Sequence, residues 1–303
     1  MKQQDFILKL LAWKFANLMY KPSGFTRPSR KAVMEHTSKD VGLDLCTIYS
    51  TWEKETFLLN NDGIDIPAEY HPVASAKGIA ILAHGFGQNR YAMLPQAKIF
   101  RDMGYSTVLF DQRHFGESKA PNSTFGIKEA SDIVALAEWS RKRHGNNSRI
   151  VVLGVSMGAM ALMHALAVTD QIDAAIEDCG PAEMETVLDT LHRSVFGFSN
   201  QFLEDTVRKI SASYGVPSDR NKPVEGVAQS RIPLLVIHGE ADSAVDVKQA
   251  TEIYAASKNP ISRMKTFPGR EHAFSVQDAD LYRKTIEEFL RDIFENNDKE
   301  CTK

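Results

Sequence analysis

The chain contains few cysteines, with three among its 303 residues: Cys46, Cys179 and Cys301. An odd number of widely separated cysteines does not match a disulfide framework or the spacing of a zinc site. Spacings such as His-Glu-x-x-His are also absent from the sequence, so we expect no metal and no other cofactor. This cysteine usage favours a reducing compartment, and we therefore expect a cytoplasmic protein.

Neither sign of charge dominates the composition. Lys and Arg number 36 against 39 Asp and Glu, which leaves a net charge of -3. Because no basic stripe with interleaved aromatic residues is present, nucleic acid is not expected as a partner. The hydrophobic fraction of 43% and the charged fraction of 25% are ordinary for a globular protein with a large core. The composition leaves the oligomeric state open.

The sequence also lacks an apolar run long enough to cross a bilayer. Its most apolar stretch, residues 6–20, is interrupted by Lys9 and Lys14 and has no signal-peptide cleavage site. The pattern predicts an amphipathic helix, which fits docking on its own domain. Because Trp13 is flanked by lysines, it also fits peripheral membrane contact through residues 1–20. The apolar positions at helical spacing are Leu8, Leu11, Phe15 and Leu18.

Residues 1–50 are expected to form an N-terminal helical extension, because a second helical stretch lies near residues 31–36. No chemistry is recognisable there. From residue 51 to residue 303 strand and helix patterns alternate, which requires an α/β fold with a mostly parallel sheet covered by helices on both faces. The first two strands differ, because Asn61-Asp62-Gly63 is a turn signal that predicts an antiparallel hairpin.

The alternation breaks once, over residues 181–231, where helical patterning continues without a strand. This insertion is a candidate helical cap, although helices packed directly on the sheet would show the same pattern. Its apolar positions are Val187, Leu188, Leu191, Val195, Phe196, Phe202, Leu203, Val207 and Ile210.

The residues Gly154-Val155-Ser156-Met157-Gly158 lie between an apolar strand pattern and a small-residue helix pattern. Strand, sharp turn and helix in this order, with a serine at the apex, form a nucleophile elbow. Gly154 and Gly158 are needed because the strand reverses directly into a helix, which brings the turn against neighbouring backbone. We therefore predict that Ser156 is a strained, exposed nucleophile.

A nucleophilic serine needs a general base and a third group that orients this base. His272 lies in a loop between the last strand pattern and the last helix pattern, at the carboxyl end of the predicted sheet. We predict that His272 is the base. The remaining histidines considered are interpreted as surface or core residues: His36, His71, His144, His164, His192 and His238.

Asp242 is the predicted orienting acid, because it follows the strand pattern at 234–237 and precedes His272. This placement gives the chain order nucleophile, acid, base. Glu240 and Asp246 are local competitors, but Asp246 precedes a helix pattern and is better explained as its N-cap. Asp178 is a further competitor because it follows the strand pattern at 174–176.

Acyl transfer passes through an oxyanion that backbone N–H groups stabilise. The elbow supplies one such donor, the N–H of Met157 at the amino end of a helix. The second donor is expected from residues 83–88, a glycine-rich loop after an early strand. Gly85 and Gly87 leave its backbone able to turn the N–H of Phe86 inward.

Several of these segments together resemble the successive signatures of the α/β-hydrolase superfamily. More narrowly, they resemble the branch with monoglyceride lipases and serine aminopeptidase-like hydrolases, including uncharacterised bacterial members with an apolar N-terminal segment. The resemblance implies that Arg113 and Gly116 shape a loop beside the site. His114 replaces a usual glycine, and Asp246 replaces a common proline. The segments that carry the resemblance are residues 84–87, 111–118, 154–158, 238–242 and 269–272.

These roles combine into a serine hydrolase that cleaves a small carboxylic ester through an acyl-enzyme. Phe86, Met157 and the aromatic residues of the insertion suggest an apolar acyl group of short to medium chain. A peptidase or amidase, a thioesterase or an acyltransferase would use the same triad. A non-hydrolytic ligand receptor on a hydrolase scaffold is the alternative from another class.

Overall fold

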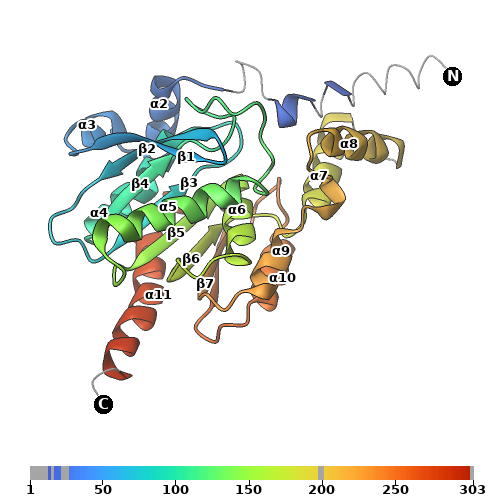
Figure 1. Cartoon of the computed structure of the whole chain (residues 1–303). Helices are drawn as coiled ribbons and strands as arrows, with labels where there is room; N and C mark the ends of the chain where they lie inside the picture. The colour runs from blue at the N-terminus through green and yellow to red at the C-terminus, as the bar shows by residue number, and fades with distance from the viewer. Residues whose placement is uncertain (1–12, 15–16, 22–26, 197–200, 301–303) are drawn as a thin grey trace.

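The computed structural model describes residues 13–14, 17–21, 27–196 and 201–300 (Figure 1). Several predicted positions lie outside what it describes. They are Leu8, Leu11, Phe15 and Cys301, together with the side chains of Val195, Phe196, Phe202 and Leu203.

Eight strands form one sheet in the order β1-β2-β4-β3-β5-β6-β7-β8. The first two form the predicted antiparallel hairpin, in which Asp62 and Gly63 adopt the positive φ angles of 52° and 74° that a two-residue turn requires. β2 is also antiparallel to β4, and every later pair is parallel, which confirms the mostly parallel α/β fold. The strands are β1 (Glu55–Asn61), β2 (Ile64–His71), β3 (Ile79–Ala83), β4 (Ser106–Phe110), β5 (Ile150–Val155), β6 (Ala174–Asp178), β7 (Leu234–Gly239) and β8 (Arg263–Phe267).

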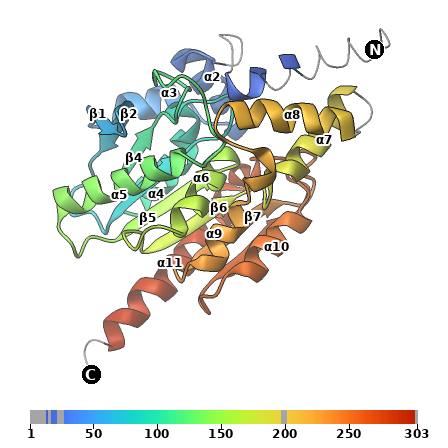
Figure 2. The ribbon, with the colours of Figure 1, turned by 45° about the vertical axis from the view of Figure 1, so that its right-hand side comes forward.

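Helices cover both faces of this sheet (Figures 1 and 2), and the central strands are therefore buried on both sides. The core on one face includes residues of α2 (Arg30–Val41), α3 (Leu45–Ser50), α4 (Leu94–Asp102) and α11 (Ala279–Glu300). The core on the other face includes residues of α5 (Glu129–His144), α6 (Met157–Leu166), α9 (Pro223–Gln229) and α10 (Lys248–Ala256). Short 3-10 turns lie at η2 (Arg90–Met93), η3 (Ser218–Arg220) and η4 (Ser275–Gln277).

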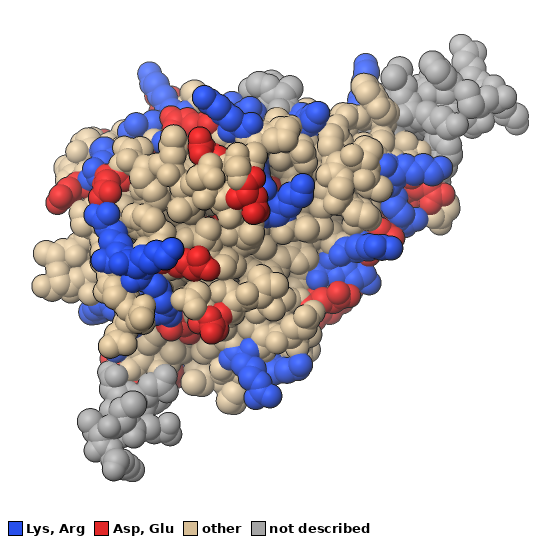
Figure 3. Space-filling model, viewed as in Figure 1, with Lys and Arg blue, Asp and Glu red and all other residues tan. Residues whose placement is uncertain are grey.

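Within the ranges that the structure describes, every helix is too short or too polar to span a bilayer. On the face seen in Figure 1, basic and acidic side chains are intermixed (Figure 3).

The insertion between β6 and β7 divides into two parts. α7 (Met184–Phe196) and α8 (Gln201–Ser213) stand apart from the layers on the sheet in both ribbon views. α9 instead packs tightly against α6, because a Cβ atom at Gly226 would lie 2.0 Å from the carbonyl oxygen of Met163. The helical pattern of the sequence could not distinguish these two arrangements, and the structure contains both.

A third apolar cluster joins α7 and α8 to the rest of the molecule. Tyr20 stacks on Tyr214 with ring centroids 5.3 Å apart and meets the ring of Phe125 edge-on at 5.1 Å. The N-terminal segment therefore shares a core with the insertion and with the first turn of α6. The buried members of this cluster are Met19, Tyr20, Phe115, Phe125, Met157, Met160, Met184, Leu188, Val207 and Val216.

A buried ion network holds the loop that follows β4. Arg90, 2% exposed, pairs with Glu69 in β2 and with Asp111 after β4. The backbone N–H of Glu117 also donates to Asp111 Oδ2, at 2.8 Å. A Cβ atom at Gly116 would lie 2.2 Å from the carboxyl carbon of Asp111, so a larger residue cannot occupy this position without displacing the network.

Arg113 fastens the same loop to a helix. Its Nε and Nη2 atoms donate to the two carboxylate oxygens of Asp132 in α5, at 2.8 and 2.7 Å. This two-pronged contact fixes the orientation of both groups. The loop that Arg113 and Gly116 were expected to shape is thus held on one side by the Asp111 network and on the other by α5.

Candidate active site

Ser156 lies in a tight turn between β5 and α6 and has φ 54° and ψ -113°, a combination that is strained for a residue with a side chain. Gly154 and Gly158, two residues before and after Ser156, are required because neighbouring backbone atoms lie too close to leave room for a side chain. A Cβ atom at Gly154 would lie 2.3 Å from the Gly158 oxygen, and one at Gly158 would lie 2.2 Å from the Ala83 oxygen. The strand, turn and helix therefore have the geometry that the sequence motif predicts.

This turn lies where the strand order of the sheet reverses. β3 and β5 are neighbours, but the chain runs from β3 to β4 on one side and from β5 to β6 on the other. In open α/β sheets, ligands bind in the crevice that such a reversal creates at the carboxyl ends of the strands. The loop after β3 is correspondingly close to the elbow, since a Cβ atom at Gly85 would lie 3.5 Å from Ser156 Cβ.

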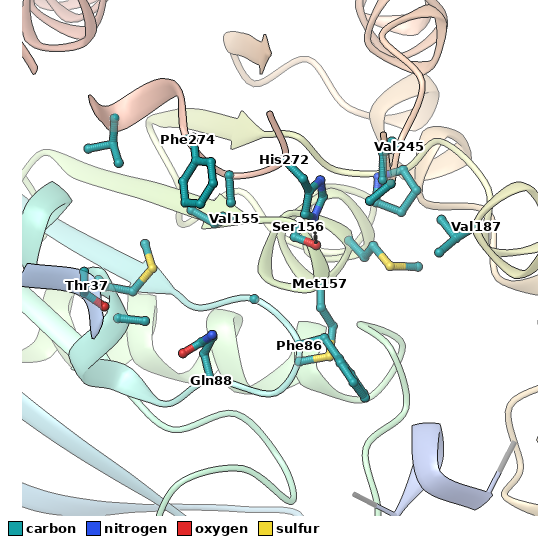
Figure 4. A pocket seen from close by; sticks show the side chains of 18 of the residues that line it. Thr37, Phe86, Gln88, Val155, Ser156, Met157, Val187, Val245, His272 and Phe274 are labelled. Atoms are coloured by element: carbon teal, nitrogen blue, oxygen red, sulfur yellow. Dashed lines mark hydrogen bonds between the residues drawn. The ribbon is translucent and has the colours of Figure 1, made fainter. Parts of the chain in front are cut away.

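The structure brings the three predicted residues together from three strand ends. Ser156 follows β5, Asp242 follows β7 and His272 follows β8. His272 Nε2 lies 2.9 Å from Ser156 Oγ (Figure 4), and His272 Nδ1 lies 2.7 Å from Asp242 Oδ2. Because a carboxylate only accepts hydrogen bonds, Nδ1 carries the proton and Nε2 presents its lone pair to the serine hydroxyl.

The Asp242 carboxylate is fully buried and held from two sides. Its Oδ1 atom accepts from the backbone N–H groups of Ala244 and Val245, at 2.9 and 2.8 Å. Burial acts to raise its pKa, but hydrogen bonds from His238 and His272 hold the pKa of Asp242 well below its usual range. The group is therefore a fixed negative charge at neutral pH.

The other acids considered from the sequence have different partners. Asp178 accepts from the Tyr282 hydroxyl at 2.8 Å, and Glu240 accepts from the Thr266 hydroxyl at 2.7 Å. Asp246 accepts from the backbone N–H of Lys248 at 2.9 Å, in the first turn of α10. Among the four candidate acids, the one that the structure places against His272 is Asp242.

His238 has a role that sequence reasoning missed. The imidazole is buried, and its Nε2 atom lies 2.8 Å from the carbonyl oxygen of Val245 and 3.3 Å from Asp242 Oδ2. The N–H at Nε2 is therefore shared between the two oxygens. The sequence signal for this contact was the position of His238 four residues before Asp242. A histidine at the end of a strand is also commonly a core residue, so this signal did not identify the contact.

Two buried carboxyl groups lie at the end of β6, beneath the site. Burial raises the pKa of Glu177 to about 8 and the pKa of Asp178 to about 6. Burial likewise raises the pKa of the adjacent Cys179 thiol. Ligand atoms of Cys179, Asp242 and His272 lie within 4.8 Å of one another, a separation that could hold a metal ion. Such an ion would have to displace the hydrogen bond between Asp242 and His272.

The loop after β3 is braced by the buried imidazole of His84. Its Nε2 atom accepts from the backbone N–H of Gln112 at 3.1 Å, so Nδ1 carries the proton and donates to the Gly85 carbonyl oxygen at 2.8 Å. Burial lowers the pKa of His84, which keeps the ring neutral as this pattern requires. Because the peptide is trans, the N–H of Phe86 points opposite to the held carbonyl.

A cavity of about 530 Å³ opens at Ser156 and His272. Thr37 and Gln88 lie on one side of Ser156, and Val187 lies on the other (Figure 4). The apolar side is lined by Phe86, Met157, Met160, Met184, Val187 and Leu191. The opposite side, which we call the α2 side, holds the polar residues His36, Thr37, Asp40, Gln88 and Gln96 and the ring of Phe274, among apolar residues that include Val41, Met93 and Pro95.

Known proteins resemble this chain in sequence and in fold. The model of the prolyl oligopeptidase family matches residues 92–297. The chain is 26% identical over 258 residues to the uncharacterized protein YqkD of Bacillus subtilis, and this match covers 83% of the chain and 84% of YqkD. It is 27% identical over 227 residues to the uncharacterized protein YfhR of Escherichia coli K12, and this match covers 74% of each protein.

Among solved structures, an esterase of Pyrococcus furiosus, Pf2001, superposes with a TM-score of 0.66 at 21% identity. The match covers 84% of this chain and 92% of the esterase. At this identity the likeness establishes the shared fold.

Proposed function

Because the chain belongs to the prolyl oligopeptidase family, and is therefore a serine hydrolase of the α/β-hydrolase type, we propose that it cleaves small carboxylic esters with an apolar acyl group of short to medium length. The observation that carries the proposal is the cavity, in which an apolar side adjoins Ser156. Burying an acyl chain there removes its methylene groups from water, at about 0.8 kcal/mol for each.

In the proposed reaction, Ser156 Oγ attacks the ester carbonyl carbon while His272 Nε2 accepts the hydroxyl proton. The resulting imidazolium is stabilised by Asp242, and it returns the proton to the departing alkoxide as the carbon–oxygen bond breaks. Water then repeats these steps on the acyl-enzyme and releases the acid. The support for these roles is the chain of contacts from Ser156 through His272 to Asp242, at 2.9 and 2.7 Å.

We assign the oxyanion to the backbone N–H groups of Met157 and Phe86. Met157 is the first residue of α6, so its N–H has no acceptor within the helix. The Phe86 N–H belongs to the peptide whose carbonyl His84 holds at 2.8 Å. Fixing such donors before the reaction is worth about 3 to 4 kcal/mol for each in acyl transfer.

A peptidase is the second candidate, and the family match supports it, since that family is described by its oligopeptidases. The same nucleophile, base and oxyanion donors would cleave an amide, with an amine in place of the alcohol as leaving group.

A panel of 4-nitrophenyl acetate, butyrate and decanoate, with alanine 4-nitroanilide beside them, tests the proposal. We expect kcat/KM to rise about tenfold from acetate to butyrate, because two more methylenes become buried. It should fall again at decanoate, as the proposed preference for acyl groups of short to medium length requires. Faster cleavage of the anilide would favour the peptidase, and a folded protein inert to every ester would contradict the proposal.

We also propose peripheral membrane contact through residues 1–20 of an otherwise cytoplasmic protein. Trp13 and Leu18 are 54% and 42% exposed, and Leu18 also lines the cavity. Free thiols at Cys46 and Cys179 support a reducing compartment.

Trp13→Glu should reduce co-sedimentation with anionic lipid vesicles at least fivefold, because it removes an interfacial aromatic residue and adds a repelled charge.

The control for this measurement is Leu58→Glu, which makes the same change in charge at a residue 65% exposed on β1. This variant should sediment with vesicles like the wild type. Equal sedimentation of all three proteins would exclude the contact through Trp13.

A further inference from the structure

Apart from Ser156 and His272, the polar side chains that line the cavity are concentrated on the α2 side. Residues of the apolar side belong to the third apolar cluster, which the insertion and the first turn of α6 share. The α2 side is contributed by one face of α2, by the loop after β3, by α4 and by the segment after His272. Lining positions on α2 recur at helical spacing, with His36 four residues before Asp40 and Thr37 four before Val41, so the helix presents one continuous face to the cavity.

Asp40 gives the α2 side a negative charge. Of the described residues that line the cavity, it is the one acid, and none of them is a lysine or an arginine. The carboxylate is 26% exposed, and the partner the structure records for it is His36 Nε2, at 3.5 Å. A histidine neutralises the negative charge of a carboxylate only when its imidazole is protonated.

Two further groups on this side suit the same ligand. The side-chain oxygen of Gln96, a residue 4% exposed, has no hydrogen-bond partner among the described residues. It can accept a hydrogen bond that the protein itself does not supply. Phe274 offers an aromatic ring at the cavity wall (Figure 4), and a cation over such a face is attracted by the ring quadrupole. A carboxylate, an unused acceptor and an aromatic ring all favour a cation that carries an N–H.

We propose that the α2 side binds the alcohol part of the ester, and that this alcohol carries an ammonium group recognised by Asp40. The inference rests on the proposed esterase function, because an apolar acyl chain on the apolar side leaves the α2 side for the leaving group. Anionic alcohols are disfavoured, since they would face Asp40 without a compensating lysine or arginine. The substrate class is thus esters of amino alcohols.

Two isosteric esters test this inference. In 2-(dimethylamino)ethyl butyrate, which is protonated at neutral pH, an N–H⁺ replaces the C–H at the branch point of 3-methylbutyl butyrate. For the wild type at pH 7, we expect kcat/KM for the cationic ester to exceed that for the neutral ester about tenfold. Asp40→Asn should lower this ratio about fivefold, because it removes the charge and keeps the shape. The neutral ester is the internal reference, so a general loss of activity cancels.

Glu35→Gln is the matched control, because it removes the same charge from the same helix. Glu35 points to solvent, where it lies 3.7 Å from Lys31, and this variant should keep the wild-type ratio. Raising the NaCl concentration to 1 M should reduce the ratio in the wild type and leave it constant in Asp40→Asn.

The outcomes separate the inference from the function on which it rests. A wild-type ratio near one, or a ratio that Asp40→Asn leaves unchanged, would overturn recognition of an ammonium group while the esterase assignment stands. If the folded wild type cleaves neither ester, the proposed function fails and the inference fails with it.

Discussion

Ser156→Ala is expected to lower kcat for ester hydrolysis by about 10⁴-fold or more without unfolding the protein. The substitution removes the oxygen that attacks the carbonyl carbon, and the thiol of the adjacent Cys179 is buried, with a pKa that burial raises. The fold should persist because alanine keeps the Cβ atom at the turn, and the backbone N–H of residue 156 still donates to the Asp178 carbonyl at 2.8 Å.

Two measurements check this expectation. The variant should show no burst in stopped-flow hydrolysis of 4-nitrophenyl butyrate, and a fluorophosphonate probe should no longer label it. Ser50→Ala, at an exposed helix residue, is the control and should be labelled like the wild type. Labelling of Ser156→Ala at the wild-type rate would show that another residue is the nucleophile.

Arg90→Met is expected to lower the free energy of unfolding by about 3 to 5 kcal/mol. The guanidinium of Arg90 neutralises two buried carboxylates, Glu69 and Asp111, and also contacts Glu117 at 2.8 Å. A methionine of similar length fills the space but leaves the two buried carboxylates without the guanidinium that neutralises them. Urea unfolding followed by circular dichroism measures the loss.

The comparison for this variant is Arg283→Met, which breaks the pair with Glu287 on the surface of α11. Both side chains of that pair are more than a third exposed, at 42% and 45%, so we expect a change below about 1 kcal/mol. Equal losses in the two variants would indicate that the buried network contributes no more than an exposed ion pair. Adding Glu69→Gln to Arg90→Met should recover part of the stability, because it removes one of the unpaired charges.

The sequence was sufficient to predict the turn that carries Ser156 and the approach of Asp242 and His272 to it, because each of the three segments is recognisable from its own residues. Gly154, Ser156 and Gly158 are neighbours in the chain, and the backbone clashes that demand the glycines arise within one turn and its adjoining strand. Asp242 and His272 could be placed because residues that follow parallel strands meet at one edge of a sheet. Chain order and element type were therefore enough to bring these groups together.

The α2 side of the cavity could not be predicted in the same way. Asp40 belongs to a helix with many charged residues and carries no motif, and its position at the cavity depends on how α2 packs against α4 and the sheet. Arg90 and Glu69 were also beyond prediction, because charged residues are normally exposed and only tertiary contacts reveal that these are paired and buried. His238 was interpreted as a surface or core residue, because its position at a strand end does not reveal its contact with Asp242.

The proposed reacting groups and parts of the cavity wall have separate supports. Ser156, Asp242 and His272 follow β5, β7 and β8, whereas one part of the wall comes from α2, which precedes the sheet, and another comes from α7, which is inserted between β6 and β7. A substitution in α2 or α7 can therefore reshape the cavity without moving a strand end. Selection can change which ester such a protein accepts while the hydrolytic chemistry stays constant, so substrate preference can diverge among relatives faster than the reaction they share.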